Sequence, residues 1–195
     1  ASGALYLTGR FARTLYFGGQ KHEPASDRSD AYIAKYDASG TFQWVHTFGG
    51  PDPYIRDAGT GIAIHPSGSI YATGDAFGEI TVDGQTFEPN AEMYLFEFDP
   101  SGTLQSSTFY DNVDPQALTI DGAGDLHVAG RYLDKNAPLD LGEDDGTGDF
   151  FVAKLDDSGN LIWSRHPDRG TGRERALDLA IDPSGRVAVT GTYED

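Results

Sequence analysis

The sequence predicts an all-β protein made of β-propeller blades, each with four antiparallel strands, and three observations lead to this prediction. A pattern of about 60 residues recurs along the 195-residue chain. Within each period, short apolar segments alternate with tight turns of the Asp-x-Ser-Gly type. No segment has the sustained 3.6-residue periodicity of an amphipathic helix. We therefore expect a tandem array in which each repeat is one small antiparallel sheet.

Two sequence units make up the repeat. The longer unit is DAYIAKYDASGTFQWVHTFGG and the shorter one is GIAIHPSGSIYATGDAF. Copies of the longer unit lie at 30–50, 91–111 and 148–168, and copies of the shorter unit lie at 61–77, 117–132 and 178–193. The end of the shorter unit also opens the chain, at 4–11. Each unit has the pattern strand, turn, strand, so one full period supplies four strands.

The first strand of the longer unit is apolar on both faces. In 31–36, Tyr32, Ala34 and Tyr36 share one face, and Ala31 and Ile33 share the other. The segments 93–98 and 150–155 have the same pattern. A strand that is apolar on both faces is normally covered on both sides. We expect the neighbouring repeats to be the covering layers.

The turns have a common chemistry that explains the aspartates they contain. They lie at 37–40, 65–68, 99–102, 121–124, 156–159 and 182–185. Aspartate at the first position accepts a backbone N–H two residues on, and glycine at the last position tolerates a positive φ. We therefore interpret these aspartates as turn-forming residues rather than catalytic ones. Each variable segment between the two hairpins of a period also contains a short strand, as in 14–19, 79–84 and 138–142.

If the strands of a blade are lettered A to D, the chain divides into incomplete and complete blades. The segment 1–58 supplies strands B, C and D, 59–115 and 116–174 are full blades, and 175–195 supplies strands A and B. This amounts to about three blades plus one extra strand in a single repeat array. We expect a partial propeller or a part of a multi-chain ring, and therefore a homo-oligomer or a piece of a longer polypeptide.

The two units together resemble the bacterial SBBP-type β-propeller repeat, whose consensus is close to "GIAVDSSGNVYVTGSF … DAFVAKLDSSGNLLWSKTFGG". The resemblance covers nearly the whole chain, with Ser106 as a departure at the position of Trp44 and Trp163. The family implies secreted or cell-surface proteins in which the propeller is one module of a longer chain. It has no shared catalytic residues, so it implies no active site.

Composition excludes several classes of function. The formal net charge of −17 disfavours nucleic acid and anionic membranes as partners, because both need clustered Lys and Arg. The chain has no cysteine, which excludes disulfides and thiolate metal sites. No apolar run reaches the roughly 18 residues of a membrane span, so we expect no membrane insertion.

One acidic segment is a candidate calcium site. Its oxygen ligands would be Asp140, Glu143, Asp144, Asp145 and Asp149. Calcium prefers six to eight oxygen ligands, and glycines in the segment permit a turn around an ion. The spacing differs from that of an EF-hand loop, and a solvated acidic loop is the alternative. No other cofactor is expected.

Aromatic and basic residues supply candidate binding positions. Trp44 and Trp163 occupy the same position of two repeats, where they either stack on a sugar or protein partner or pack between blades. Arg169 and Arg173 belong to a basic cluster in 165–175, which either captures an anionic ligand or pairs with nearby acids.

The favoured function is a non-enzymatic extracellular module, a scaffold that binds a protein or a glycan through the loops that break the repeat. These loops are 20–30, 51–58, 84–91, 133–149 and 166–175. One alternative is an enzyme, such as a hydrolase or lyase, whose site lies on the propeller axis. The other is a unit that self-assembles through the strand edges at its termini.

Overall fold

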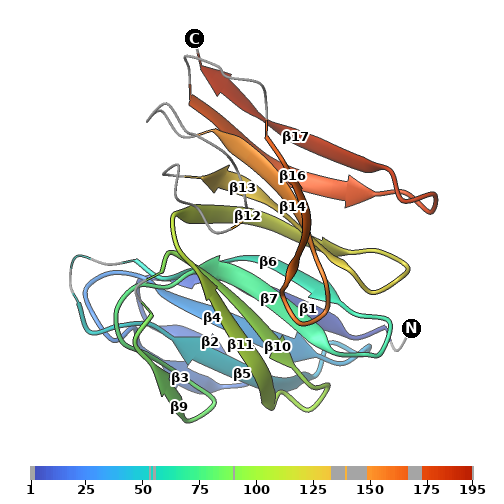
Figure 1. The fold of residues 1–195 in the computed structure, drawn as a ribbon. Helices are drawn as coiled ribbons and strands as arrows, with labels where there is room; N and C mark the ends of the chain where they lie inside the picture. The colour runs from blue at the N-terminus through green and yellow to red at the C-terminus, as the bar shows by residue number, and fades with distance from the viewer. Residues whose placement is uncertain are drawn as a thin grey trace.

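The structure is a computed structural model, and it describes residues 3–52, 54, 56–89, 91–132, 139, 149–166 and 173–194. Over these residues the chain forms β-strands and no helix (Figure 1). Four antiparallel sheets contain the longer strands. The described residues thus contain no helix long and apolar enough to cross a membrane.

The four sheets follow one another along the chain. The first contains β1 (Leu5–Phe11), β4 (Asp30–Tyr36) and β5 (Phe42–Phe48); the second contains β6 (Ala58–Ile64), β7 (Ile70–Asp75), β10 (Met93–Phe98) and β11 (Leu104–Tyr110). The third contains β12 (Val113–Ile120), β13 (Leu126–Tyr132), β14 (Phe150–Leu155) and β15 (Leu161–Arg165), and the fourth contains β16 (Arg173–Ile181) and β17 (Val187–Glu194). In each sheet the spatial order equals the chain order, which is the meander of a propeller blade. The predicted fold class is confirmed.

The sheets pack face to face in chain order, with the first and the last at opposite ends of the stack (Figure 1). Tyr94, Phe96 and Phe98 of β10 pack with Ile33 and Phe48 of the first sheet. The opposite face of β10 packs against β12, β13 and β14 of the third sheet. The third and fourth sheets share a smaller apolar cluster. The prediction that neighbouring repeats cover both faces is confirmed for β10 and β14, whereas among the described residues β4 has a neighbouring repeat on one face only.

The glycine near the end of β7 and of β13 is required by the close approach of the neighbouring strand. A side chain at Gly74 or Gly130 would overlap the backbone carbonyl of Ala58 or Asp114 on the neighbouring strand. The register shifts at that point, between Gly59 and Gly61 and between Pro115 and Ala117. The β-bulge brings the two backbones so close that only glycine fits.

The hairpin turns close as the sequence predicts. Asp37 Oδ1 accepts the backbone N–H groups of Ser39 and Thr41, at 2.8 and 3.0 Å, and the Ser39 hydroxyl at 2.6 Å. The Ser39 hydroxyl and then the Thr41 N–H lower the pKa of Asp37. Corresponding bonds form at Asp99, Asp121, Asp156 and Asp182. These aspartates are confirmed as turn-forming residues.

The register places all these turns at one end of the stack and the other connections at the opposite end. The strand pairs at this opposite end are Phe11 with Asp30, Ala31 with Phe48 and Ala58 with Asp75. We call the connecting segments at this end the loop face, and they are 12–29, 49–57, 76–92 and 111–112. Two of the segments contain a hairpin where we expected one short strand: β2 (Leu15–Phe17) with β3 (Gln20–His22), and β8 (Ile80–Val82) with β9 (Gln85–Phe87).

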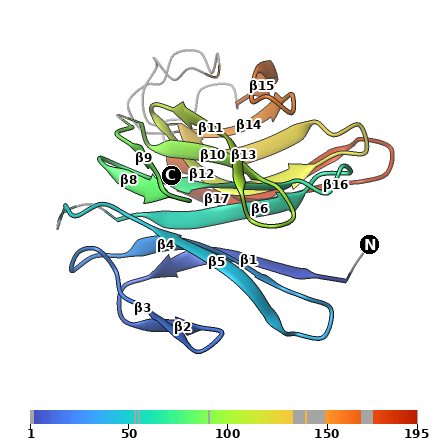
Figure 2. The same cartoon turned by 90° about the horizontal axis from the view of Figure 1, so that it is seen from below.

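The two hairpins cover hydrophobic surface of the sheets. Phe17 of β2 contacts the rings of Tyr32 and Phe42, on the side of the first sheet that faces away from the others (Figure 2). Ile80 and Val82 of β8 join the core between the first and second sheets. The remaining excursion, 133–148, lies outside the described residues apart from Leu139.

Candidate functional site

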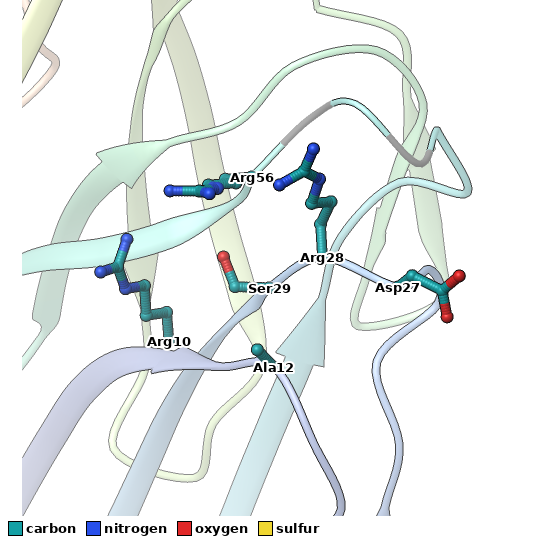
Figure 3. A pocket seen from close by; sticks show the side chains of 6 residues that line it. All are labelled: Arg10, Ala12, Asp27, Arg28, Ser29 and Arg56. Atoms are coloured by element: carbon teal, nitrogen blue, oxygen red, sulfur yellow. The ribbon is translucent and has the colours of Figure 1, made fainter.

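The loop face is hollowed at the first sheet by an open pocket of about 340 Å³. Its lining residues are Arg10, Ala12, Asp27, Arg28, Ser29 and Arg56. Arg10 lies at the end of β1, Arg28 precedes β4 and Arg56 precedes β6, so three separate segments each contribute one arginine. The three guanidinium groups gather around the Ser29 hydroxyl, while the carboxylate of Asp27 is turned away from them (Figure 3). We call this site the arginine pocket.

Backbone contacts join the two loops that form the pocket. The Asp57 N–H donates to the Ser29 carbonyl at 2.8 Å, and the Ser29 hydroxyl donates to the Asp57 carbonyl at 3.2 Å. Ser29 and Asp57 are both buried. These bonds fix the segment before β4 against the segment before β6, so the floor of the pocket is held by ordered backbone.

Two buried carboxyl groups lie behind this floor. Asp57 accepts the N–H groups of Gly50 and Phe77, at 3.0 and 3.2 Å, and Asp30 accepts the Ala25 N–H at 2.9 Å. Burial raises the pKa of Asp57 to about 6, against the opposing effect of its two N–H donors, and the Asp30 charge adds to the increase. Burial also raises the pKa of Asp30. Backbone donors, rather than the pocket arginines, therefore hold these carboxyl groups.

Two arginines of the pocket differ from Arg131 and Arg175 in their ion pairing. Arg131 and Arg175 each donate to Asp114, with nitrogen–oxygen distances of 3.1 Å. Within the described part of the chain, Arg10 and Arg56 form no ion pair or hydrogen bond. The charges of Arg10 and Arg56 are therefore not paired with a described acid by a direct bond, and like charges brought together repel one another.

A second polar cluster lies next to the pocket, where the first three sheets approach one another. It centres on Asp75 at the end of β7. Burial raises the pKa of Asp75 to about 7, and the Asp114 charge adds to the increase. Arg175 and Arg10 act in the opposite direction. Arg10 thus influences Asp75 through space without forming a bond to it.

The predicted calcium ligands Asp140, Glu143, Asp144 and Asp145 lie outside the described residues, and only Asp149 is described. Asp149 is buried and accepts the Tyr132 hydroxyl at 2.9 Å. Asp30 begins β4, Glu92 directly precedes β10 and Asp149 directly precedes β14. An acid therefore recurs at the same position of three blades, and Asp149 is one of these acids. In the described residues no three acids or histidines are grouped as they would be around a metal ion. Calcium binding stays a prediction.

The two tryptophans both pack against other side chains of the stacked sheets. They belong to the first and third sheets, so they do not form one site. Trp44 of β5 lies 6.3 Å from the rings of Tyr6 and Phe98, and its Nε1 donates to the Pro100 carbonyl at 3.4 Å. Because Phe98 and Pro100 belong to the second sheet, Trp44 joins two blades. Trp163 of β15 packs edge-on against His127 of its own blade, at 5.7 Å, beneath the Arg165 guanidinium.

The predicted basic cluster is only partly described. Arg169 lies outside the described residues, and only the backbone of Arg173 is described, as the first residue of β16. Arg175 pairs with Asp114. For this member of the cluster, the structure agrees with the alternative that the arginines pair with nearby acids. The sequence reasoning did not select Arg10, Arg28 or Arg56. A signal existed, because Arg28 and Arg56 belong to two of the loops that break the repeat, 20–30 and 51–58.

Comparisons with known proteins find matches among solved structures alone. No family model matches the chain, and no curated protein matches it. The resemblance to SBBP-type repeats therefore stays a prediction. A protein of unknown function from Bacteroides caccae covers 93% of this chain at 9% sequence identity, with a TM-score of 0.48. The Dos1 propeller covers 90% at 13% identity, with a TM-score of 0.40. This chain spans 50% and 51% of those two chains, about half of their length.

Proposed function

We propose that this chain is a non-enzymatic binding module whose loop face holds a protein or glycan partner outside the cell. The arginine pocket carries the proposal. It is concave, it is lined by Arg10 of β1 and by two loops that vary between repeats, and Arg10 and Arg56 form no ion pair with a described acid in a protein of net charge −17. Ligand sites in repeat proteins concentrate in such loops, because the strands beneath are committed to packing.

The hairpin turns at the other end support the same assignment. One carboxylate oxygen of Asp37 and of Asp99 accepts two backbone N–H groups, so that oxygen is engaged within the turn. The two ends of the stack thus differ in chemistry. One end is closed within each hairpin, whereas the other brings several chain segments together around a hollow.

The proposal is tested by attaching the protein to a surface so that only one end of the stack is accessible to a ligand. Because the chain has no cysteine, a single introduced thiol attaches it to a surface in one orientation. Ala123→Cys attaches the turn end and leaves the loop face open, whereas Glu88→Cys attaches the loop face; both positions are exposed. A panel of neutral, sulfated and carboxylated oligosaccharides is then passed over both surfaces.

We expect oligosaccharide binding to the Ala123→Cys surface and much weaker binding to the Glu88→Cys surface. Equal binding in both orientations would contradict the assignment to the loop face. Mass spectrometry of the recovered oligosaccharides tests the non-enzymatic part, since cleavage or modification of the bound sugar would show an enzyme.

A further inference from the structure

We propose that the arginine pocket binds a sulfate or phosphate ester carried by a single sugar residue. This inference rests on the proposed binding function and names the chemistry of the ligand. The first step concerns charge. Arg10, Arg28 and Arg56 direct three guanidinium groups to one hollow, and Arg10 and Arg56 form no bond to an acid among the described residues. A bound anion would remove their mutual repulsion.

The second step concerns geometry. The three arginines approach from separate chain segments, and the Ser29 hydroxyl lies between them (Figure 3). Guanidinium groups donate pairs of parallel N–H bonds to oxyanions. A tetrahedral group offers oxygens in several directions and can meet donors on three sides, whereas a carboxylate offers two oxygens in one plane. The arrangement therefore favours sulfate or phosphate over a carboxylate.

The third step concerns size. The pocket volume of about 340 Å³ lies at the lower end of the roughly 300–1,000 Å³ that small-molecule sites occupy. A free inorganic ion would fill only a small part of it, since one water takes about 30 Å³ in the liquid. The remaining space suits one sugar ring bonded to the anionic group.

The fourth step limits the total charge of the ligand. The protein has a formal net charge of −17, so its overall field repels long polyanions. A single ester group places its charge inside the pocket and little charge outside it. The ligand is therefore a monoester rather than a densely charged chain.

Comparison with Arg131 and Arg175 shows that Arg10 and Arg56 do not form the ion pairs that join neighbouring strands elsewhere. Arg131 lies at the end of β13, as Arg10 lies at the end of β1, and both Arg131 and Arg175 form an ion pair with Asp114. Arg10 and Arg56 have no such partner. Their removal should leave the folded chain intact, which makes them suitable for a binding test.

The test is calorimetric titration of the 195-residue chain at low ionic strength. The ligands are galactose 6-sulfate, glucose 6-phosphate, inorganic sulfate, inorganic phosphate, glucuronate and unmodified galactose. Sodium chloride at matched ionic strength is the control for screening, because exposed charges interact over only about 10 Å at 0.1 M salt. The variants are Arg10→Ala, Arg56→Ala and, as a matched control on the turn end, Arg186→Ala.

We expect the sugar esters to bind most tightly, and Arg10→Ala and Arg56→Ala each to weaken them about tenfold or more, because each removes charge-assisted hydrogen bonds. Arg186→Ala should bind like the unaltered chain, since Arg186 is exposed and pairs with Asp182. The melting temperatures of Arg10→Ala and Arg56→Ala without ligand should equal or exceed that of the unaltered chain.

Several results would overturn the inference. Equal responses to sulfate and chloride would show screening alone, and unchanged affinity in Arg10→Ala and Arg56→Ala would place the ligand elsewhere. Glucuronate binding as tightly as the esters would contradict the tetrahedral assignment, and free sulfate or phosphate binding as tightly as the sugar esters would show that the ligand is the ion. Oligosaccharide binding to the Ala123→Cys surface with no response to any anion would overturn this inference and leave the proposed function standing.

Discussion

Arg175 of β16 donates to both carboxylate oxygens of Asp114 on β12, at 3.3 and 3.1 Å. The two residues belong to the innermost strands of neighbouring blades, and Asp114 also pairs with Arg131 of its own blade at 3.1 Å. One carboxylate therefore pairs with two arginines where the third and fourth sheets meet. The side chain of Asp114 is only 14% exposed, whereas those of Arg131 and Arg175 are 29% and 39% exposed, so these ion pairs are partly buried.

The first prediction is that Asp114→Ala destabilises the protein by about 1–3 kcal/mol, because it leaves two partly buried arginines without a partner. Denaturant unfolding followed by tryptophan fluorescence measures this change. Glu23→Ala is the control, because Glu23 pairs with Lys21 at the exposed surface and its loss should have no measurable effect. An equally small effect of both substitutions would show that the Asp114 pairs contribute little.

The second prediction concerns pH. The folded protein keeps a proton on Asp75 up to a pKa of about 7, whereas the unfolded chain releases it near the ordinary value of 3.8. Between these values the folded state binds more protons, so the stability contributed by protonated Asp75 is complete below about pH 4 and is lost as the pH rises through 7. The Asp57 carboxyl, with a pKa of about 6, acts in the same direction.

Asp75→Asn should remove the larger part of this dependence. We expect the variant to be more stable than the unaltered chain at pH 8, on the order of 2–4 kcal/mol, and to have little advantage at pH 4. Thermal and chemical unfolding across this range measure the difference. A constant difference at all pH values would show that Asp75 does not titrate between 4 and 7.

The third prediction is that Gly130→Ala destabilises the protein by about 2 kcal/mol or more. The added methyl would overlap the Asp114 carbonyl, and the backbone of the bulge cannot move away without breaking ladder hydrogen bonds. Gly122→Ala is a matched control in the adjacent turn, where an added Cβ would meet no atom within 4 Å. Similar unfolding midpoints for the two variants would contradict the steric explanation.

The fourth prediction separates the two interpretations of Trp44. If its main role is to join the first two blades, Trp44→Ala should cost about 2–4 kcal/mol of stability, and Trp44→Phe should recover part of it by keeping the ring contacts with Tyr6 and Phe98. Unchanged stability together with reduced oligosaccharide binding would favour the sugar-stacking alternative.

The strands and turns could be predicted because their causes are local. Alternation of side chains along β10 shows both apolar faces within six residues, and the Asp99 turn forms from residues at most four positions apart. The hairpin of β2 and β3 has a local signal as well, since it turns at Gly18 and Gly19, both with positive φ. Our expectation of a single strand there missed that signal.

The arginine pocket could not be predicted in the same way. Arg10 and Arg131 occupy equivalent positions in the sequence repeat, yet Arg131 pairs with Asp114 and Arg10 has no such bond. That difference arises because, in the described part of the chain, the first sheet has the order β1-β4-β5 and lacks a strand beside β1 that corresponds to β12 beside β13. The meeting of Arg10 with Arg28 and Arg56 also requires three segments to converge, a property of the tertiary fold.

The acid at the start of each third strand has a practical consequence for engineering. Asp30 receives the Ala25 N–H, Glu92 receives the Asn112 N–H and Asp149 receives the Tyr132 hydroxyl, so one position anchors three unrelated partners. A loop transplanted from one blade to another needs only one suitably placed N–H or hydroxyl to form a hydrogen bond with this acid. The blades should therefore accept foreign recognition loops of different length, with the strands left unchanged.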